Sequence, residues 1–127
     1  MTAHPTDPIT AYGDAWLAED DDERRRLLEV AWAPGAVYCD PLDLVEGRES
    51  LGRHIAATQA ALAGGRVAVT STPVRHHDSA FFRWTITDVA GATVLSGFDV
   101  VQLDAEGRIA RLTGFFDTDT GTQPGTA

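Results

Sequence analysis

Residues 97–117, GFDVVQLDAEGRIARLTGFFD, predict two long antiparallel strands joined by a tight turn. The turn is DAEGR, residues 104–108, in which Gly107 suits a left-handed backbone. The first strand starts at Thr93 and is apolar on both faces, so we expect other elements to cover both of its sides. Asp99 interrupts this strand, and an ionised carboxylate in apolar surroundings is costly unless it is paired. We interpret Asp99 as pointing into a ligand pocket.

Further strands are expected on the N-terminal side of this pair. Four segments have the composition of strands: residues 36–40, 43–47, 66–74 and 80–88. In the third segment Pro73 marks an edge or a bend. In the fourth, Phe82, Trp84 and Ile86 alternate with Arg83 and two threonines, which indicates one apolar face.

The spacing of apolar residues predicts three helices before these longer strands. The first covers residues 8–18, the second ends near residue 32, and the third covers residues 48–64. We expect Asp7 to cap the first helix, and the acidic residues 19–23 to favour the N-terminus of the second. Helices on one side of an antiparallel sheet make an α+β fold, and a curved sheet over them leaves a hollow for a small ligand.

The composition excludes several classes of partner. The chain has 127 residues and a net charge of −9, which argues against nucleic acid and anionic membranes. A single cysteine, Cys39, forms no internal disulfide, and we see neither a signal peptide nor a membrane span. We therefore expect a cytoplasmic protein with one domain over residues 8–117 and disordered ends at 1–7 and 118–127.

Taken in order, five segments resemble the NTF2-like superfamily, which includes ketosteroid isomerase and the SnoaL-like polyketide cyclases. The segments are AYGDAWLAEDD (11–21), AVYCDP (36–41), GRESLGRHI (47–55), FFRWTI (81–86) and GFDVVQLDAEGRIARLTGFF (97–116). The resemblance implies the NTF2-like cone, in which three N-terminal helices pack on a strongly curved, mainly antiparallel sheet that encloses an apolar pocket. It also implies a homodimer.

The resemblance implies roles for three residues. In ketosteroid isomerases an aspartate in a similar DP element is the general base, and Asp40 matches it. A neutral aspartic acid and a tyrosine form the oxyanion hole of those enzymes, and Asp99 and Tyr12 match them. We therefore expect Asp40, Asp99 and Tyr12 to be the catalytic residues.

Other interpretations of the same residues stay open. An Asp-Pro pair commonly opens a turn, and Asp99 could instead bond the backbone or Arg111. In the SnoaL-like cyclases an aspartate on a late strand is the base and a histidine assists it. Asp99 would then be the base, and His54 would polarise the substrate, although a histidine on an apolar helix face is commonly a core residue.

The expected substrate-binding walls come from the faces that would line the pocket. These residues are Trp16, His54, Phe82, Trp84, Val101 and Phe116. The same positions also suit a hydrophobic core. Walls of this kind fit a flat, apolar or aromatic ligand.

Other chemistries have less support in the sequence. No histidines or cysteines have metal-ligand spacing, and no glycine-rich phosphate loop follows a strand, so we expect neither a metal nor a cofactor. Epoxide hydrolases of the superfamily use two acids bridged by an arginine. Arg83 and Arg111 alternate away from Trp84 and Phe116, which disfavours that reaction.

Three functional hypotheses follow. The first is a ketosteroid-isomerase-type enzyme that moves a proton next to a carbonyl of an apolar substrate through an enolate. The second is a protein that binds an apolar metabolite without catalysis. The third is an aldol-type polyketide cyclase with Asp99 as base.

Overall fold

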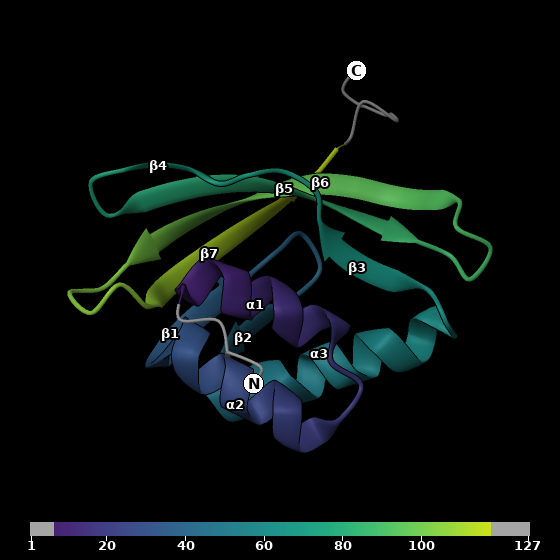
Figure 1. Cartoon of the computed structure of the whole chain (residues 1–127), viewed down its shortest axis with the longest axis horizontal. Helices are drawn as coiled ribbons and strands as arrows, with labels where there is room; N and C mark the ends of the chain where they lie inside the picture. Colours follow the sequence, from purple (N-terminus) through teal and green to yellow (C-terminus); the bar gives the residue numbers. More distant parts are fainter. Residues whose placement is uncertain (1–6, 118–127) are drawn as a thin grey trace, which may run out of the picture.

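A computed structural model describes residues 7–117 of the chain (Figure 1). The predictions made for residues 1–6 and 118–127 lie outside the described residues. The elements are, in order, α1 (Pro8–Leu17), α2 (Asp21–Ala31), β1 (Trp32–Cys39), β2 (Leu44–Glu46), α3 (Arg48–Leu62), β3 (Arg66–Val69), β4 (Val74–His76), β5 (Ser79–Thr87), β6 (Thr93–Leu103) and β7 (Ile109–Phe116). No helix in this part of the chain is long and apolar enough to cross a membrane.

The seven strands form one curled, mixed sheet. Its order is β2-β1-β7-β6-β5-β3, and β4 also pairs with β5. The β1–β7 pair is parallel and all the other pairs are antiparallel. The predicted hairpin of residues 97–117 is therefore the β6–β7 pair at the centre of the sheet.

One of the predicted strands is divided into two strands in the structure. Residues 66–74 were expected to form a single strand, but the structure has β3 and β4 with an irregular segment between them. Pro73 lies in that segment, and proline has no N–H to give to a ladder. The break is bridged by two bonds to Arg83, whose carbonyl accepts from Thr70 N and whose N–H donates to Ser71 Oγ.

The helices begin where the sequence indicates. Asp7 caps α1 by accepting a bond of 2.9 Å from Thr10 N, with Pro8 in the first turn. Asp20 caps α2 by accepting from Glu23 N at 2.8 Å, and three acidic residues follow in its first turn. These caps confirm the expected function of the acidic stretch.

A buried arginine links the three helices, and no sequence pattern had indicated it. Arg24 is 4% exposed. Its guanidinium donates to Asp21 Oδ1 at 2.6 Å, and to the Ala18 carbonyl and Gln59 Oε1 at 2.8 Å each. Gln59 Nε2 in turn donates to the carbonyls of Trp16 and Ala18. The end of α1 is therefore fixed against α2 and α3.

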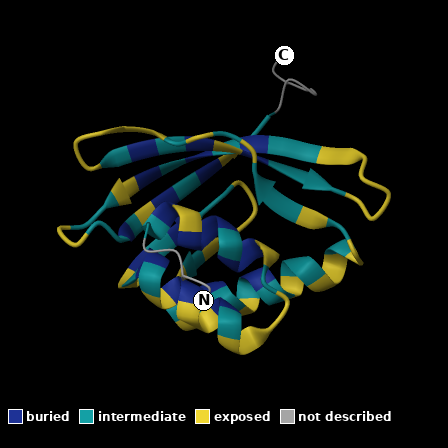
Figure 2. Cartoon of the chain, in the orientation of Figure 1, coloured by how far each residue is buried: buried dark blue, intermediate teal, exposed yellow. Residues whose placement is uncertain are grey.

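All three helices lie on one face of the sheet, and the sheet curls over them (Figure 1). The core between these layers holds the largest fully buried side chains: Trp32, Phe82, Ile9, Leu28, Leu51, Ile55, Ile109, Leu112 and Val101. Figure 2 shows buried residues on both layers. The α+β fold is as predicted.

The expectation that β6 is covered on both faces is wrong within the described residues. Its outer face carries only side-chain contacts within the sheet: the Phe98 ring lies 5.3 Å from Phe81 and 5.0 Å from Phe115, between ring centroids. The guanidinium of Arg83 lies over Phe81 and Phe98. The rings of neighbouring strands therefore contact one another on a face that no other element of the described chain covers.

Candidate functional site

A cavity of about 190 Å³ lies between the helices and the inner face of the sheet. Its walls are mainly apolar. Of the nine candidate residues from the sequence, seven line it: Tyr12, Trp16, Asp40, His54, Trp84, Asp99 and Phe116. Phe82 and Val101, which we expected in the walls, are both fully buried in the core and are not among the lining residues.

Asp99 lies at the buried end of the cavity, on the inner face of β6. Its side chain is 5% exposed. Trp84 Nε1, from β5, donates a hydrogen bond of 3.0 Å to Asp99 Oδ1. Asp99 pairs with Phe82 on one neighbouring strand and with Gly114 on the other. Trp84 therefore holds the carboxyl at Oδ1, and Gly114, which has no side chain, leaves space beside it.

A glycine in β6 makes the Trp84–Asp99 bond possible. Trp84 pairs directly with Gly97, so the indole must cross β6 to reach Asp99. A Cβ at position 97 would lie 2.3 Å from Trp84 Cζ2 and 2.1 Å from the Phe115 carbonyl oxygen. Only glycine leaves that path free.

The surroundings of Asp99 favour its protonated form. Burial raises the pKa of Asp99 to about 7; the bond from Trp84 acts in the opposite direction, and the negative charge of Asp40 adds to the rise. A carboxyl with this pKa exists in both protonation states near neutral pH. It can therefore act either as an acid or as a base.

Asp40 lies across Gly114 from Asp99, where β1 ends. A Cβ on Gly114 would be 2.9 Å from Asp99 Oδ1 and 3.5 Å from Asp40 Cβ. Asp40 Oδ1 accepts from the N–H groups of Leu42 and Asp43 at 2.9 and 2.8 Å, and Oδ2 accepts from the Tyr38 hydroxyl at 2.5 Å. Asp40 therefore both opens the turn, as the Asp-Pro pair suggests, and lines the cavity.

Two tyrosines supply hydroxyl groups. The ring of Tyr12 lies between Trp32 and Phe82, at centroid distances of 5.8 and 6.1 Å. Burial, with the Asp99 charge as a smaller cause, raises the pKa of Tyr12 well above its usual value. Burial and the bond to Asp40 likewise raise the pKa of Tyr38. Both hydroxyls keep their protons at neutral pH and can donate hydrogen bonds.

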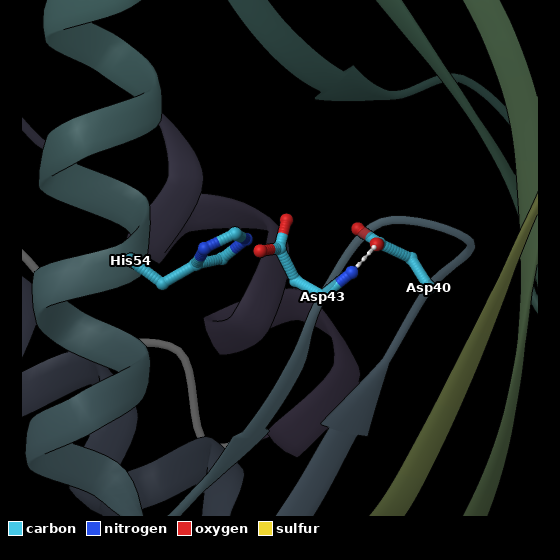
Figure 3. A group of neighbouring side chains, drawn as sticks. All are labelled: Asp40, Asp43 and His54. Carbon is cyan, nitrogen blue, oxygen red and sulfur yellow. Dashed lines mark hydrogen bonds between the residues drawn. The ribbon is translucent and has the colours of Figure 1, made fainter.

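His54 projects from α3 toward the outer part of the cavity. Its ring lies 5.1 Å from Tyr38 and 5.9 Å from Trp16. Ligand atoms of His54, Asp40 and Asp43 all lie within 4.8 Å of one another. Figure 3 shows the Asp43 carboxylate between the imidazole and Asp40. This group has the donor types of a metal site, although no linear spacing in the sequence indicates one.

Sequence reasoning missed Tyr38 and Asp43 as site residues. Tyr38 precedes Asp40 by two residues, so the alternation of a strand would have directed both to the same side. Asp43 lies in the turn that Asp40 caps, and no local pattern brings it to His54. The arginines expected to point away do so: Arg83 and Arg111 are exposed, and neither lines the cavity.

Comparison with known proteins identifies the family. A model of the SnoaL-like domain matches residues 9–112. The chain belongs to the SnoaL-like family. Among curated proteins, no match was found. The same fold recurs in solved structures.

A SnoaL-like protein from Agrobacterium tumefaciens, described as a candidate isomerase, is 36% identical. It aligns over 90% of this chain and 100% of its own, with a TM-score of 0.81. A candidate polyketide cyclase from Sinorhizobium meliloti is 25% identical over 87% of this chain and 94% of its own, with a TM-score of 0.67. An NTF2-like protein from Exiguobacterium, 16% identical over 87% of this chain and 98% of its own, shares the fold at a TM-score of 0.68.

Proposed function

We propose that this SnoaL-like protein is an acid–base enzyme of the ketosteroid-isomerase type, which moves a proton next to a carbonyl of an apolar substrate through an enolate. The observation that carries the proposal is Asp99: a buried carboxyl with a pKa of about 7 at the end of an apolar cavity. Such a group is matched to proton transfer at neutral pH. The relative from A. tumefaciens, described as a candidate isomerase, supports this reaction class.

In the proposed mechanism Asp99, ionised, takes a proton from the carbon beside the carbonyl. The electrons of the broken C–H bond form a C=C bond, and the carbonyl oxygen becomes an enolate oxygen. Tyr12, whose proton is firmly held, donates a hydrogen bond to that oxygen. Asp99, now a carboxylic acid, returns the proton at another carbon, so the substrate is isomerised and the enzyme is regenerated.

We assign the base role to Asp99 rather than to Asp40, to which the resemblance to ketosteroid isomerases gave that role. Asp40 accepts three hydrogen bonds from the protein, which occupy both of its carboxylate oxygens. Its fixed negative charge instead raises the pKa of Asp99. Trp84 fixes the orientation of Asp99 through its N–H.

The size of the cavity limits the substrate. Pockets for drug-sized ligands usually have volumes of about 300–1,000 Å³. The 190 Å³ of this cavity is smaller, which favours a substrate with one or two rings over a four-ring steroid.

The test is the isomerisation of two β,γ-unsaturated ketones, cyclohex-3-enone and a 3-keto-Δ5-steroid, followed by the ultraviolet absorbance of the conjugated product. We expect turnover of the smaller ketone with kcat/KM rising through about pH 7 as Asp99 ionises. Asp99→Asn should lower kcat/KM about 10²–10⁴-fold, and Asp40→Asn should lower it much less. A larger loss in Asp40→Asn would give the base role to Asp40.

Absence of turnover, with either ketone still bound, would favour the metabolite-binding hypothesis. An aldol-type cyclase is the second enzymatic candidate, because it uses the same first step with Asp99 as base and one structural relative is described as a candidate polyketide cyclase. A cyclase would leave both ketones unchanged and close a ring in a poly-β-ketone. That activity should also be lost in Asp99→Asn.

We further propose that the protein is a homodimer that acts in the cytoplasm. The outer face of the sheet supports the dimer: Phe81, Phe98 and Phe115 stack there, and Phe115 is 43% exposed. An apolar surface without a covering layer of this chain is typical of a protein interface. The proposed ligand is a small apolar molecule, with neither nucleic acid nor a membrane as partner.

A further inference from the structure

The cavity has an excess of negative charge. Three carboxyl groups line it, those of Asp40, Asp43 and Asp99. None of the ten arginines of the sequence, which has no lysine, is among its lining residues. A pocket with this charge repels carboxylate and phosphate ligands, and it attracts cations.

The three carboxyl groups are not spread evenly. Asp99 lies at the buried end, whereas Asp43 is exposed and lies with Asp40 and His54 at the end that opens to solvent, which we call the mouth. Figure 3 shows the three side chains directed toward one another there. In the described chain, Arg48 and Arg53, the basic residues nearest to His54 in sequence, bond instead to backbone carbonyls and to Ser50.

Two aromatic rings line the cavity beside the same mouth. Tyr38 and Trp16 pack against His54, at centroid distances of 5.1 and 5.9 Å, and all three line the cavity. An ammonium group is attracted to the faces of aromatic rings as well as to carboxylates. A neutral imidazole can in addition accept a hydrogen bond from it.

A metal ion is the other cation that the mouth could hold. Asp40 already accepts three hydrogen bonds, from two N–H groups and the Tyr38 hydroxyl, so it has about one acceptor site left for either kind of cation. The two cations differ in that a metal ion would make no use of the aromatic rings. The combination of rings and carboxylates therefore favours an organic ammonium.

We propose that the mouth, formed by Asp40, Asp43 and His54 beside the rings of Tyr38 and Trp16, binds the ammonium group of an amine-bearing apolar substrate. The inference rests on the proposed function, because the apolar part of that substrate would fill the cavity toward Asp99. It narrows the substrate class to small ring compounds that carry both a carbonyl and an amine.

The test compares two probes that have the same ring system and differ in charge. These are 1-naphthylmethylammonium and the neutral 1-naphthalenemethanol, each titrated by calorimetry into the full chain at pH 7 with a chelator present. We expect the ammonium to bind about five- to thirtyfold more tightly than the alcohol. Asp43→Asn should weaken ammonium binding about three- to tenfold and leave alcohol binding unchanged.

Glu29→Gln is the matched control. It removes one negative charge from an exposed position on α2 and should change neither affinity. Equal affinities for the two probes, in the wild type and in Asp43→Asn, would overturn the inference but leave the apolar cavity of the proposed function intact. Failure of both probes to bind would count against the cavity itself.

A third titration, with zinc chloride and no chelator, separates the two kinds of cation. Stoichiometric zinc binding that Asp43→Asn abolishes, together with no preference for the ammonium probe, would overturn the inference in favour of a metal site. Preference for the ammonium in the presence of chelator supports it.

Discussion

At the scale of single residues, Asp99 shows how function and stability oppose each other. The side chain is 5% exposed, and its pKa is about 7 in the folded protein against 3.8 for an unperturbed aspartate. Between these two values the folded state binds more protons than the unfolded state, so the free energy of unfolding falls as pH rises. The buried carboxyl that could serve as a base is therefore also a source of instability above neutral pH.

Asp99→Asn should remove this dependence. We expect the variant and the wild type to differ little near pH 4, because the wild-type carboxyl is then protonated in the folded state. Above pH 7 the variant should be more stable, by roughly 2–4 kcal/mol, because an amide does not ionise and can still accept the Trp84 bond. Urea denaturation at pH 4, 6 and 8 measures the difference, with Glu29→Gln as an exposed control. A difference in the free energy of unfolding that does not change with pH would contradict the raised pKa of Asp99.

At the scale of elements, two glycines in the neighbouring strands β6 and β7 give the site residues the space that they need. Gly97 lets the indole of Trp84 cross β6, and Gly114 lets Asp99 and Asp40 approach each other from β6 and the end of β1. Both glycines are in strands, where glycine is normally unfavourable. The cost is offset by contacts that larger residues would prevent.

Gly97→Ala should be strongly destabilising. The new Cβ would lie 2.1 Å from the Phe115 carbonyl oxygen and 2.3 Å from Trp84 Cζ2, so the β6–β7 backbone and the indole must both move. Overpacking of this kind costs about 1–3 kcal/mol or more. Gly35→Ala in β1 is the control, since nothing lies within 4 Å of its added Cβ, and its effect should stay within about 0.5 kcal/mol. Equal urea midpoints for the two variants would refute this account of Gly97.

At the scale of the whole molecule, the two faces of the sheet differ in what covers them. The inner face is covered by the three helices (Figure 1) and lines the cavity. The outer face carries the phenylalanine cluster of Phe81, Phe98 and Phe115. A second copy of the chain packed on that cluster would lie on the face of the sheet opposite to the helices and the cavity. The proposed dimer and the proposed site are thus independent.

Phe115→Glu should convert the proposed dimer to a monomer. A charge placed in an apolar interface is buried without a partner, which opposes association. Light scattering after size-exclusion chromatography should report twice the mass of one chain for the wild type and the mass of one chain for the variant. Leu17→Glu, at an equally exposed position on α1, should remain dimeric. A wild type that is monomeric at all concentrations would refute the dimer.

Much of the fold could be predicted because its signals are local. The alternation in β5 and the turn at residues 104–108 depend on neighbouring residues only, and the caps of α1 and α2 depend on residues three apart. The break between β3 and β4 was missed because Pro73 was interpreted as an edge or a bend within one strand, although the apolar alternation of Val67 and Val69 ends before it. A proline has no N–H group, so it ends a strand only where the neighbouring strand would accept a hydrogen bond from that position. The sequence of one segment does not show which strand that neighbour is.

The sequence by itself determined which side chains share a face of the strand with Asp99, because side chains alternate along a strand. Since both faces of this strand are apolar, only the tertiary structure decided that the face of Asp99 points inward and what Asp99 meets there. The Trp84–Asp99 bond depends on the register of β5 against β6, and the approach of Asp43 to His54 depends on how a loop lies against a helix. Contacts between distant segments arise from packing, which no periodicity within one segment encodes.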